Sequence, residues 1–278
     1  MNKLLKTALL LGGAALSIKA LDTRLETSEY VVSSSKIPKV FDGFKIVHLT
    51  DLHSDTVTDL ISQISAEDPD IIVCTGDMAD DKGSYIPALR FVEKICKIAP
   101  CYMITGNHDV WRYDFEQMES EMTNVGAVFL RNERTIIRKE HYGISLCGID
   151  DPYSCGDTKI KECIDNALKK IPREDMYEIL LFHRANLLDL FADSSFDLIL
   201  SGHMHGGHVR IPGVGGVISP FSSCQSGENF FFPSYFSGRH KIGDADVIVS
   251  RGLGNPTVVP RIFNRPEMCV IKLKSVKE

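Results

Sequence analysis

The chain has 278 residues, of which 44% are hydrophobic and 24% are charged, so its composition is that of an ordinary globular protein with a sizeable core. Its formal net charge of −6 argues against a surface that coats nucleic acid, and we expect no nucleic-acid partner. No internal repeat, low-complexity run or long linker divides the sequence. We therefore expect one compact domain over residues 36–278, preceded by a separate segment over residues 1–35.

The N-terminal segment has the pattern of a membrane-directed sequence. Lys3 and Lys6 precede an apolar run over Ala8–Ile18, and Lys19 follows it. The run has the length of a signal-peptide core and is short for a membrane span. No small-residue cleavage triplet follows it, so an uncleaved anchor or a helix on the membrane surface fits better than a removed signal. We expect the protein at the cell membrane, on either side; a plain soluble helix and a cytoplasmic location are the alternative.

The chain has eight cysteines, and four of them lie in apolar, strand-like runs: Cys74, Cys101, Cys147 and Cys269. Free cysteine in such a run behaves as a small hydrophobic residue. No Cys-x-x-Cys motif occurs, which argues against a zinc ribbon and against a thioredoxin-type redox site. These observations favour reduced thiols.

Strands and helices alternate in the first half of the sequence. After a buried strand within Phe44–Leu49, apolar residues recur at helical spacing from Val57 to Ile64, with Asp55 or Thr56 as the cap. The next predicted elements are a strand over Ile71–Cys74, a helix around Pro87–Ile98, a strand over Cys101–Ile104 and a helix over Phe115–Val125. This order predicts right-handed βαβ units and a parallel sheet.

The second half is richer in strands. Three short runs at hairpin spacing predict antiparallel strands over Val128–Leu130, Thr135–Arg138 and Ile144–Ile149. A helix over Ile160–Leu168 precedes further predicted strands over Ile179–Phe182, Phe196–Leu200, Val209–Ile211, Val247–Ser250 and Cys269–Leu273. The pattern predicts an α/β fold in which two sheets are flanked by helices.

Five of the apolar strands end on side chains that can bind a metal. These side chains are Asp51 with His53, Asp77, Asn107, His183, and His203 with His205. In α/β folds, sites form beyond the carboxyl ends of the strands, so we expect these residues to converge although they are spread over half the chain. Glycines before Asp77, Asn107 and His203 suit tight turns that bring backbone close to a site.

Two carboxylates, one amide oxygen and four imidazoles suit two metal ions that share a bridging carboxylate, for which Asp77 is the candidate. We expect one ion to be held by Asp51, His53, Asp77 and His205, and the other by Asp77, Asn107, His183 and His203. Nitrogen and oxygen ligands without thiolate favour Mn, Fe or Zn over Ca or Mg. Two such ions, about 3.5–4 Å apart, generate hydroxide and stabilise in-line phosphoryl transfer.

His108 has no place in either ligand set. Because it follows Asn107, we expect it to face the substrate and to donate a proton to the leaving oxygen. Asp109 is expected either to orient the His108 ring or to support the ligands from behind.

The motifs Asp-Leu-His, Gly-Asp, Gly-Asn-His-Asp, a single histidine and Gly-His-x-His-Gly-Gly occur in that order. This series resembles the calcineurin-like metallophosphoesterases, and the resemblance covers about residues 41–273. It implies a four-layer αββα sandwich, a binuclear metal centre with the same division of ligands, and hydrolysis of phosphate monoesters, diesters or pyrophosphates.

Two later motifs, at residues 250–254 and 265–267, resemble the bacterial membrane-associated branch of that family. Some members of that branch act on lipid-linked substrates such as a UDP-diacylglucosamine. His208 stands where that branch more often has Gln, and no proline follows His183. Neither difference removes a ligand, but both bear on how a substrate fits, and His208 is either a substrate contact or part of the loop packing.

Other residues have simpler explanations. His48 lies within a strand and is expected in the core, whereas His141 and His240 lie in polar stretches and are expected to be solvated. Asp150 and Asp151 either line the site or end a strand in a turn. The aromatic run Phe230–Phe232, with Tyr235 and Phe236 nearby, is expected to pack beneath a loop rather than to form a wall for a lipid or a base.

The sequence thus predicts a binuclear metal-dependent phosphohydrolase that cleaves a phosphoester or pyrophosphate bond by metal-activated hydroxide, and the resemblance implies a lipid-linked or nucleotide substrate. A soluble nucleotide or protein phosphoesterase is one alternative. The other is a scaffold that binds metal without catalysis, since a fold can outlast its function.

Overall fold

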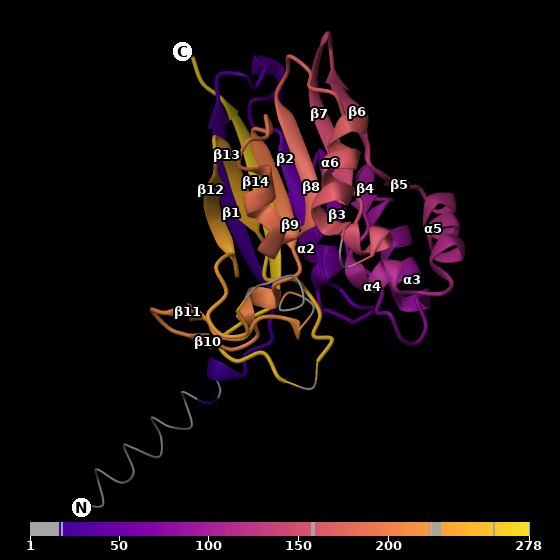
Figure 1. Ribbon diagram of the computed structural model, residues 1–278, viewed down its shortest axis with the longest axis vertical. Helices are drawn as coiled ribbons and strands as arrows, with labels where there is room; N and C mark the ends of the chain where they lie inside the picture. Colours follow the sequence, from indigo (N-terminus) through magenta and orange to yellow (C-terminus); the bar gives the residue numbers. More distant parts are fainter. Residues whose placement is uncertain are drawn as a thin grey trace, which may run out of the picture.

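The computed structural model describes residue 17 and residues 19–156, 159–221, 223, 229–257 and 259–277. Two six-stranded sheets pack face to face, and helices cover their outer faces (Figure 1). This arrangement confirms the predicted four-layer α/β sandwich. The apolar run predicted over Ala8–Ile18 lies outside the described residues, apart from Ser17. No helix among the described residues combines the length and the apolar character needed to cross a membrane.

The first sheet has the strand order β1-β14-β2-β3-β4-β5. Its strands are β1 (Glu26–Ser34), β14 (Glu267–Ser275), β2 (Lys45–Leu49), β3 (Ile71–Thr75), β4 (Cys101–Ile104) and β5 (Ala127–Phe129). Neighbouring strands are parallel except β14 and β2. The carboxyl ends of β2, β3 and β4 therefore meet at one edge of the sheet, as the βαβ pattern predicts.

Two strands of this sheet differ from the expectations. The prediction that Val128–Leu130 starts an antiparallel hairpin was wrong, because α5 (Phe115–Asn124) returns the chain so that β5 pairs parallel to β4. Residues 26–34, which we assigned to the lead-in, form β1 and pair with β14 along its whole length. The domain that we propose therefore begins at or before Glu26.

The second sheet has the order β12-β13-β9-β8-β7-β6. Its strands are β12 (Gly238–Ile242), β13 (Ala245–Val249), β9 (Leu198–Gly202), β8 (Glu178–Arg184), β7 (Tyr142–Ile149) and β6 (Glu133–Lys139). The inner pairs are parallel, whereas β12–β13 and β6–β7 are antiparallel, so the second predicted hairpin is confirmed. The carboxyl ends of β8 and β9 face the same crevice as those of the first sheet.

Alternation along the strands builds three apolar layers. In β2, Val47 and Leu49 pack towards the helices α2 (Leu60–Glu67), α3 (Ile86–Ile95) and α5, whereas Ile46 packs between the sheets. The outer face of the second sheet packs against α6 (Ile160–Lys170) and η4 (Ala185–Phe191). Helix α2 begins three residues later than Val57, because Asp59 before it has a left-handed backbone conformation.

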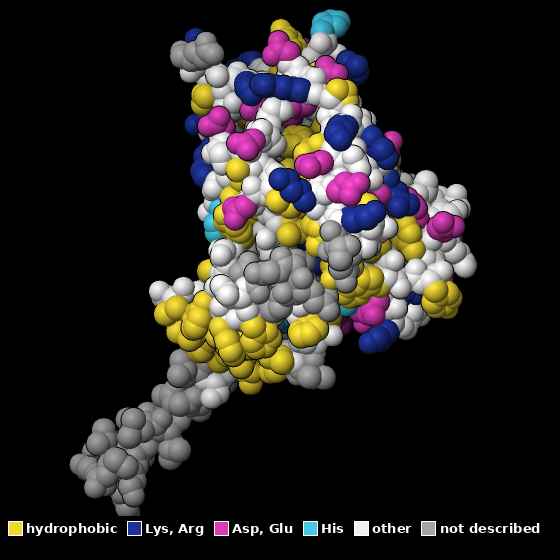
Figure 2. Space-filling model, in the orientation of Figure 1, with side chains coloured by type: hydrophobic (Ala, Val, Ile, Leu, Met, Phe, Trp, Pro, Cys, Tyr) yellow, Lys and Arg dark blue, Asp and Glu magenta, His cyan; other side chains and the backbone are white. Residues whose placement is uncertain are grey.

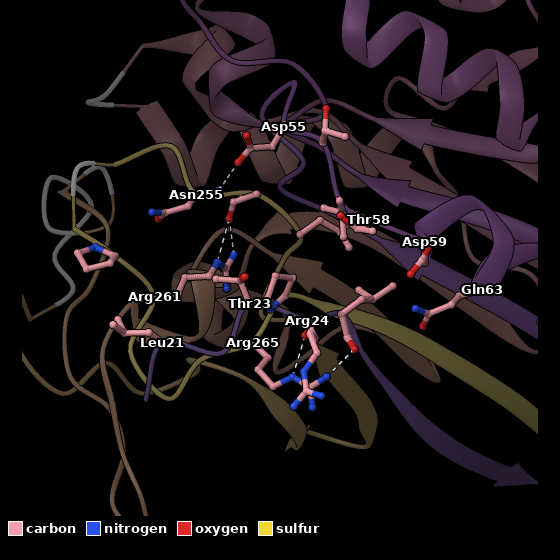
Figure 3. A pocket seen from close by; sticks show the side chains of 17 residues that line it. Leu21, Thr23, Arg24, Asp55, Thr58, Asp59, Gln63, Asn255, Arg261 and Arg265 are labelled. Atoms are coloured by element: carbon pink, nitrogen blue, oxygen red, sulfur yellow. Dashed lines mark hydrogen bonds between the residues drawn. The ribbon is translucent and has the colours of Figure 1, made fainter. Parts of the chain in front are cut away.

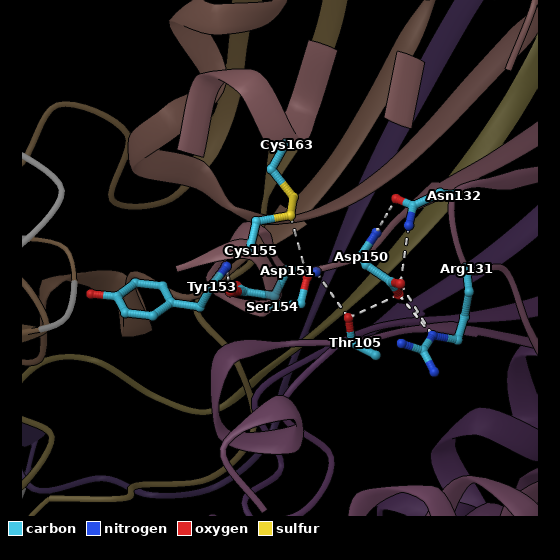
Figure 4. The surroundings of a disulfide bond; sticks show 9 residues. All are labelled: Thr105, Arg131, Asn132, Asp150, Asp151, Tyr153, Ser154, Cys155 and Cys163. Atoms are coloured by element: carbon cyan, nitrogen blue, oxygen red, sulfur yellow. Dashed lines mark hydrogen bonds and ion pairs between the residues drawn. A yellow bond between two sulfur atoms is a disulfide. The ribbon is translucent and has the colours of Figure 1, made fainter. Parts of the chain in front are cut away.

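The described cysteines are not all reduced. The four in apolar strands are buried and free, as predicted. In contrast, Cys155 and Cys163 form a disulfide (Figure 4). It joins the turn η2 (Pro152–Cys155) to the first turn of α6. The preference for reduced thiols therefore does not extend to this pair, which the fold brings within 6.1 Å between Cα atoms.

Replacing both Cys155 and Cys163 by Ser should lower the free energy of unfolding by about 2 kcal/mol, because the bridge restricts the unfolded chain over a short loop. Urea unfolding of the native protein and the double variant, each without reductant, measures this difference. Dithiothreitol should lower the stability of the native protein to that of the variant, and should leave the variant unchanged. An equal effect of reductant on both proteins would contradict the assignment.

Candidate metal centre

The seven predicted donor side chains converge in the crevice between the two sheets, and all are buried: Asp51, His53, Asp77, Asn107, His183, His203 and His205. Those from the first sheet follow β2 and β3 or begin α4 (Asn107–Val110) after β4. Those from the second sheet lie in β8, directly after β9, or at the start of η5 (His205–Gly207). The two sheets therefore contribute opposite walls of one site.

One group of donors surrounds the end of β2. The Nε2 atoms of His53 and His205 are 3.3 Å apart. Their distances to Oδ1 of Asp51 are 4.0 and 3.6 Å, respectively. Three ligand atoms thus face one point, close enough to bind a single ion.

The second group surrounds His183. Its Nε2 lies 3.2 Å from Oδ2 of Asp77, 3.2 Å from Oδ1 of Asn107 and 3.2 Å from Nδ1 of His203. This group also has the spacing of a metal site.

Asp77 lies between the two groups. Its Oδ1 accepts a hydrogen bond from the backbone N–H of His108 at 2.8 Å. Its Oδ2 is 3.2 Å from Nε2 of His183 and 3.8 Å from Nε2 of His53. A single carboxylate oxygen therefore faces donors of both groups, which is the arrangement that a bridging ligand needs.

The protonation of these groups fits a bound cation. Nδ1 of His183 donates to the carbonyl oxygen of Thr75 at 2.7 Å, so Nε2 is the atom that faces the oxygens of Asp77 and Asn107. If the ring is neutral, the lone pair on Nε2 and these oxygens repel one another unless a positive charge lies between them. Burial would lower the pKa of His183, but the carboxylates of Asp77 and Asp51 outweigh it and raise the pKa to about 10, so this point attracts a positive charge, either a proton on Nε2 or a metal ion that replaces it.

Two other imidazoles are kept neutral. Burial, with positive charge on neighbouring side chains, lowers the pKa of His203 and of His205 well below the usual value. The neutral imidazole is the form that binds a metal. The donor set therefore fits two divalent ions.

The backbone at the strand ends is strained where the donors lie. Five of the seven donors have positive φ angles: Asp51 (53°), His53 (51°), Asp77 (53°), His203 (74°) and His205 (47°). Residues other than glycine rarely adopt this conformation, and it clusters at functional sites. Glycine is needed beside them, since a Cβ atom at Gly106 would overlap the carboxylate of Asp77.

His108 lies at the edge of this centre. Its Nδ1 is 3.0 Å from Oδ1 of both Asp80 and Asp81, and its ring meets the ring of His53 edge-on at 4.6 Å. Burial would lower the pKa of His108, but the carboxylates of Asp77, Asp80 and Asp81 raise it to about 9. Sequence reasoning missed Asp80 and Asp81, although they follow Asp77 in the same loop.

Asp109 supports the backbone of the centre. Its carboxylate accepts hydrogen bonds from the backbone N–H groups of Asp77 at 2.7 Å and Gly106 at 2.9 Å. Of the two roles expected for Asp109, the structure thus has the second, support of the loop that carries Asp77. The His108 ring is contacted by Asp80 and Asp81 instead.

The remaining aspartates lie outside the centre. Asp150 pairs with Arg131 at 3.1 Å (Figure 4), and Asp151 forms a fully buried ion pair with Arg184 at 2.7 Å. Asp151 also accepts a hydrogen bond from the N–H of Tyr153, as a turn residue does. Of the two alternatives for Asp150 and Asp151, these contacts therefore favour a turn that ends the strand.

Two of the remaining histidines match their predictions. His48 is buried in β2 with its Nε2 2.7 Å from Oγ1 of Thr75, and His141 is exposed. The prediction of a solvated loop position for His240 was wrong. It lies in β12, half-buried, and its Nε2 donates to the carbonyl oxygen of Ser237.

A cleft of about 480 Å³ opens over the centre. Asn107, His203 and His205 belong to its lining, as does His208, which is buried and stacks on His205. The rest of the lining is mainly apolar: Trp111, Ile218, Pro220, Phe221, Phe230, Pro256 and Val259. The cleft is therefore polar where it meets the donors and apolar elsewhere.

The aromatic run predicted to pack beneath a loop is on the surface instead. Phe230, Phe231 and Phe232 are 47–59% exposed, and Phe230 lines the cleft. The prediction was wrong because hydrophobicity favours burial but does not reveal on which side of a loop a side chain lies.

A larger cavity, of about 800 Å³, contains none of the seven donors (Figure 3). The most buried cation in it, Arg261, already donates to the carbonyl oxygens of Gly254 and Arg251. This side chain is therefore engaged in holding the loop rather than available for an anion.

Comparisons with known proteins agree with this geometry. A model of the calcineurin-like phosphoesterase family matches residues 44–207. The uncharacterized metallophosphoesterase YkuE of Bacillus subtilis is 32% identical over 268 residues, which cover 90% of this chain and 86% of the relative. The phosphodiesterase YaeI of Escherichia coli is 26% identical over 242 residues, 83% of this chain and 82% of the relative.

Among solved structures, the phosphopantetheinyl hydrolase PptH of Mycobacterium tuberculosis superposes with a TM-score of 0.51 at 8% identity, over 77% of this chain and 91% of that one. At this identity the likeness extends to the fold only.

Proposed function

Because the chain belongs to the calcineurin-like phosphoesterase family, whose members hydrolyse phosphoester bonds at a dinuclear metal centre, we propose that it is a phosphodiesterase that uses the seven buried donors as metal ligands. The observation that carries this proposal is the position of Asp77. Its Oδ2 faces His183 of one donor group and His53 of the other.

Each donor has a place in this proposal. Asp51, His53 and His205 would hold one ion, Asn107, His183 and His203 would hold the other, and Asp77 would bridge them. When bound, two ions of Mn, Fe or Zn supply a nucleophile at neutral pH and neutralise charge on the phosphoryl oxygens.

His108 would act as the general acid. With its pKa near 9, the ring carries a proton at neutral pH, and Asp80 and Asp81 hold its Nδ1. Nε2 is then left to give its proton to the leaving oxygen. Asp109 would keep the Asp77 loop in place through its two backbone hydrogen bonds.

The cleft favours a diester over a monoester. Its described lining contains no Lys or Arg, so only the metal ions and His108 would balance the charge of a substrate. A diester carries one negative charge and has a second substituent that the apolar wall can bind. The name of the relative in Escherichia coli agrees with this choice.

We extend the proposal to a diester with an apolar substituent, such as a lipid-linked phosphoester, in preference to a nucleotide. A polar nucleotide would leave the apolar wall unpaired, whereas an acyl or prenyl group would bury it. The N-terminal apolar run would keep the protein at the membrane where such substrates occur.

The test is hydrolysis of bis(p-nitrophenyl) phosphate and p-nitrophenyl phosphate by the protein after chelator treatment and then with added Mn²⁺, Fe²⁺ or Zn²⁺. We expect no turnover without metal, restored turnover with metal, and faster cleavage of the diester. Faster cleavage of the monoester would indicate a phosphatase. Two bound ions per chain without turnover of either ester would indicate the metal-binding scaffold.

A further inference from the structure

Six exposed apolar side chains form a surface that we term the apolar rim: Ile211, Val214, Phe221, Phe230, Phe231 and Phe232. Their exposed fractions range from 45 to 73%. Figure 2 shows a continuous hydrophobic area over β10 (Arg210–Ile211) and β11 (Gly215–Gly216), the hairpin that carries Ile211 and Val214. Contiguous apolar surface of this kind marks an interaction site, whereas scattered apolar residues do not.

The rim is held by backbone hydrogen bonds. The N–H of Ser219 donates to the carbonyl oxygen of Phe230, and the N–H of Phe232 donates to that of Val217, both at 2.9 Å. Residues 230–232 therefore run alongside the chain that follows β11. The phenylalanines are presented to solvent by an ordered backbone.

The rim continues into the cleft above the metal centre. Phe221 and Phe230 belong to both, and Trp111 lines the cleft with them. Whatever covers the rim therefore also lies at the mouth of the cleft.

The start of the described chain lies beside the rim. Lys19 is exposed, and the carbonyl oxygen of Ala20 accepts a hydrogen bond from the N–H of Phe263 at 2.7 Å. The carbonyl oxygen of the preceding residue, Ile262, accepts a hydrogen bond from the N–H of Arg210 in β10 at 2.9 Å. The N-terminal segment, whose sequence contains the apolar run and three lysines, thus joins the domain at the same end as the rim (Figure 1).

We infer that the apolar rim contacts the surface of a lipid bilayer, so that the cleft opens at the level of the lipid headgroups. The rim consists of Phe, Ile and Val, which partition into the interfacial region, and Lys19 and Ala20, which follow the apolar run in the sequence, lie beside it. Protein interfaces instead rely on Trp, Tyr and Arg as anchors. This contact is additional to any membrane attachment of the N-terminal segment, because it belongs to the folded domain.

Trp111 is the one tryptophan in the sequence and is 42% exposed in the cleft, so its fluorescence reports on this face. The full-length protein is mixed with vesicles of phosphatidylglycerol and phosphatidylethanolamine whose acyl chains carry bromine, a short-range quencher. We expect strong quenching in the native protein. The double variant Phe230→Ser with Phe231→Ser should lose most of it, and so should Ile211→Ser with Val214→Ser.

The matched control is Tyr142→Ser, which removes an aromatic side chain that is 55% exposed at the β6–β7 turn, at the opposite end of the molecule (Figure 1). This variant should be quenched like the native protein. Circular dichroism of each variant verifies that it is folded.

Sedimentation with vesicles that lack bromine measures attachment by any part of the chain. A rim variant that still sediments but is no longer quenched would support the inference. Native protein that sediments without quenching of Trp111, or that does not bind vesicles, would overturn it.

Analytical ultracentrifugation without lipid tests a second copy of the chain as the occupant of the rim. A dimer that the rim variants convert to a monomer would overturn the inference in favour of that second copy. Since no readout depends on turnover, failure of the proposed enzyme activity would be seen separately.

Discussion

Replacing Asp77 by Asn should abolish the binding of both metal ions and turnover together. The carboxylate faces both donor groups through Oδ2, and a neutral amide in its place would bridge two cations only weakly. An uncharged amide also leaves the imidazoles without the negative charge that balances a divalent cation. Since metal ions contribute several kcal/mol to the stabilisation of the transition state, we expect turnover to fall by about a thousandfold or more.

The measurements are metal content by inductively coupled plasma mass spectrometry and hydrolysis of bis(p-nitrophenyl) phosphate. The matched control is Asp59→Asn, which makes the same chemical change before α2, away from the donors, where Asn tolerates the left-handed backbone. The control should keep two ions and full activity. An Asp77→Asn protein that retains both ions would show that the carboxylate is not the bridge.

Replacing His108 by Ala should reduce turnover while both metal ions stay bound. The side chain belongs to neither donor group, and the backbone N–H that donates to Asp77 remains in the variant. Loss of a general acid typically costs about 10²–10⁴-fold in rate. The loss should be largest for a diester with an alkyl leaving group and smallest for a diester that releases p-nitrophenolate, which departs without a proton.

The leaving-group dependence separates an acid from a merely structural residue. His141→Ala, in which an exposed histidine is removed far from the cleft, should not change the rates for either ester. Asp80→Asn with Asp81→Asn should cause a smaller loss of the same kind, because these carboxylates hold the His108 ring and raise its pKa. A His108→Ala protein that has also lost its metals would contradict the role of proton donor.

The alternation of strands and helices from β2 to α5 and the convergence of the seven donor side chains were predictable, because both follow from local sequence patterns. A buried strand is a continuous apolar run, and in a βαβ chain the carboxyl ends of such runs meet at one edge. Asp77 and His183 lie 106 positions apart in the numbering, yet each ends or nearly ends an apolar run. Short-range signals were therefore sufficient to select the seven side chains that lie together in the crevice.

Other features of the fold depend on contacts between segments that are distant in the sequence or joined by a turn, and the local sequence pattern does not specify these contacts. Residues 26–34 have no strong strand signal, and they become a strand because β14 offers an edge along their whole length. Val128 belongs to the first sheet because of the crossover through α5. Cys155 and Cys163 are joined because η2 and α6 bring them together.

By itself, the sequence determined the fold class and singled out seven side chains that converge in the crevice, because hydrophobic periodicity and strand ends are local properties. Only the tertiary structure decided which residues surround these seven side chains. Asp80 and Asp81 contact His108, and Asp109 accepts hydrogen bonds from the Asp77 loop. The Phe230–Phe232 run faces solvent at the mouth of the cleft. These relations depend on which loops approach one another in space. Loop conformation follows from packing against the whole fold and leaves no periodic trace in the sequence.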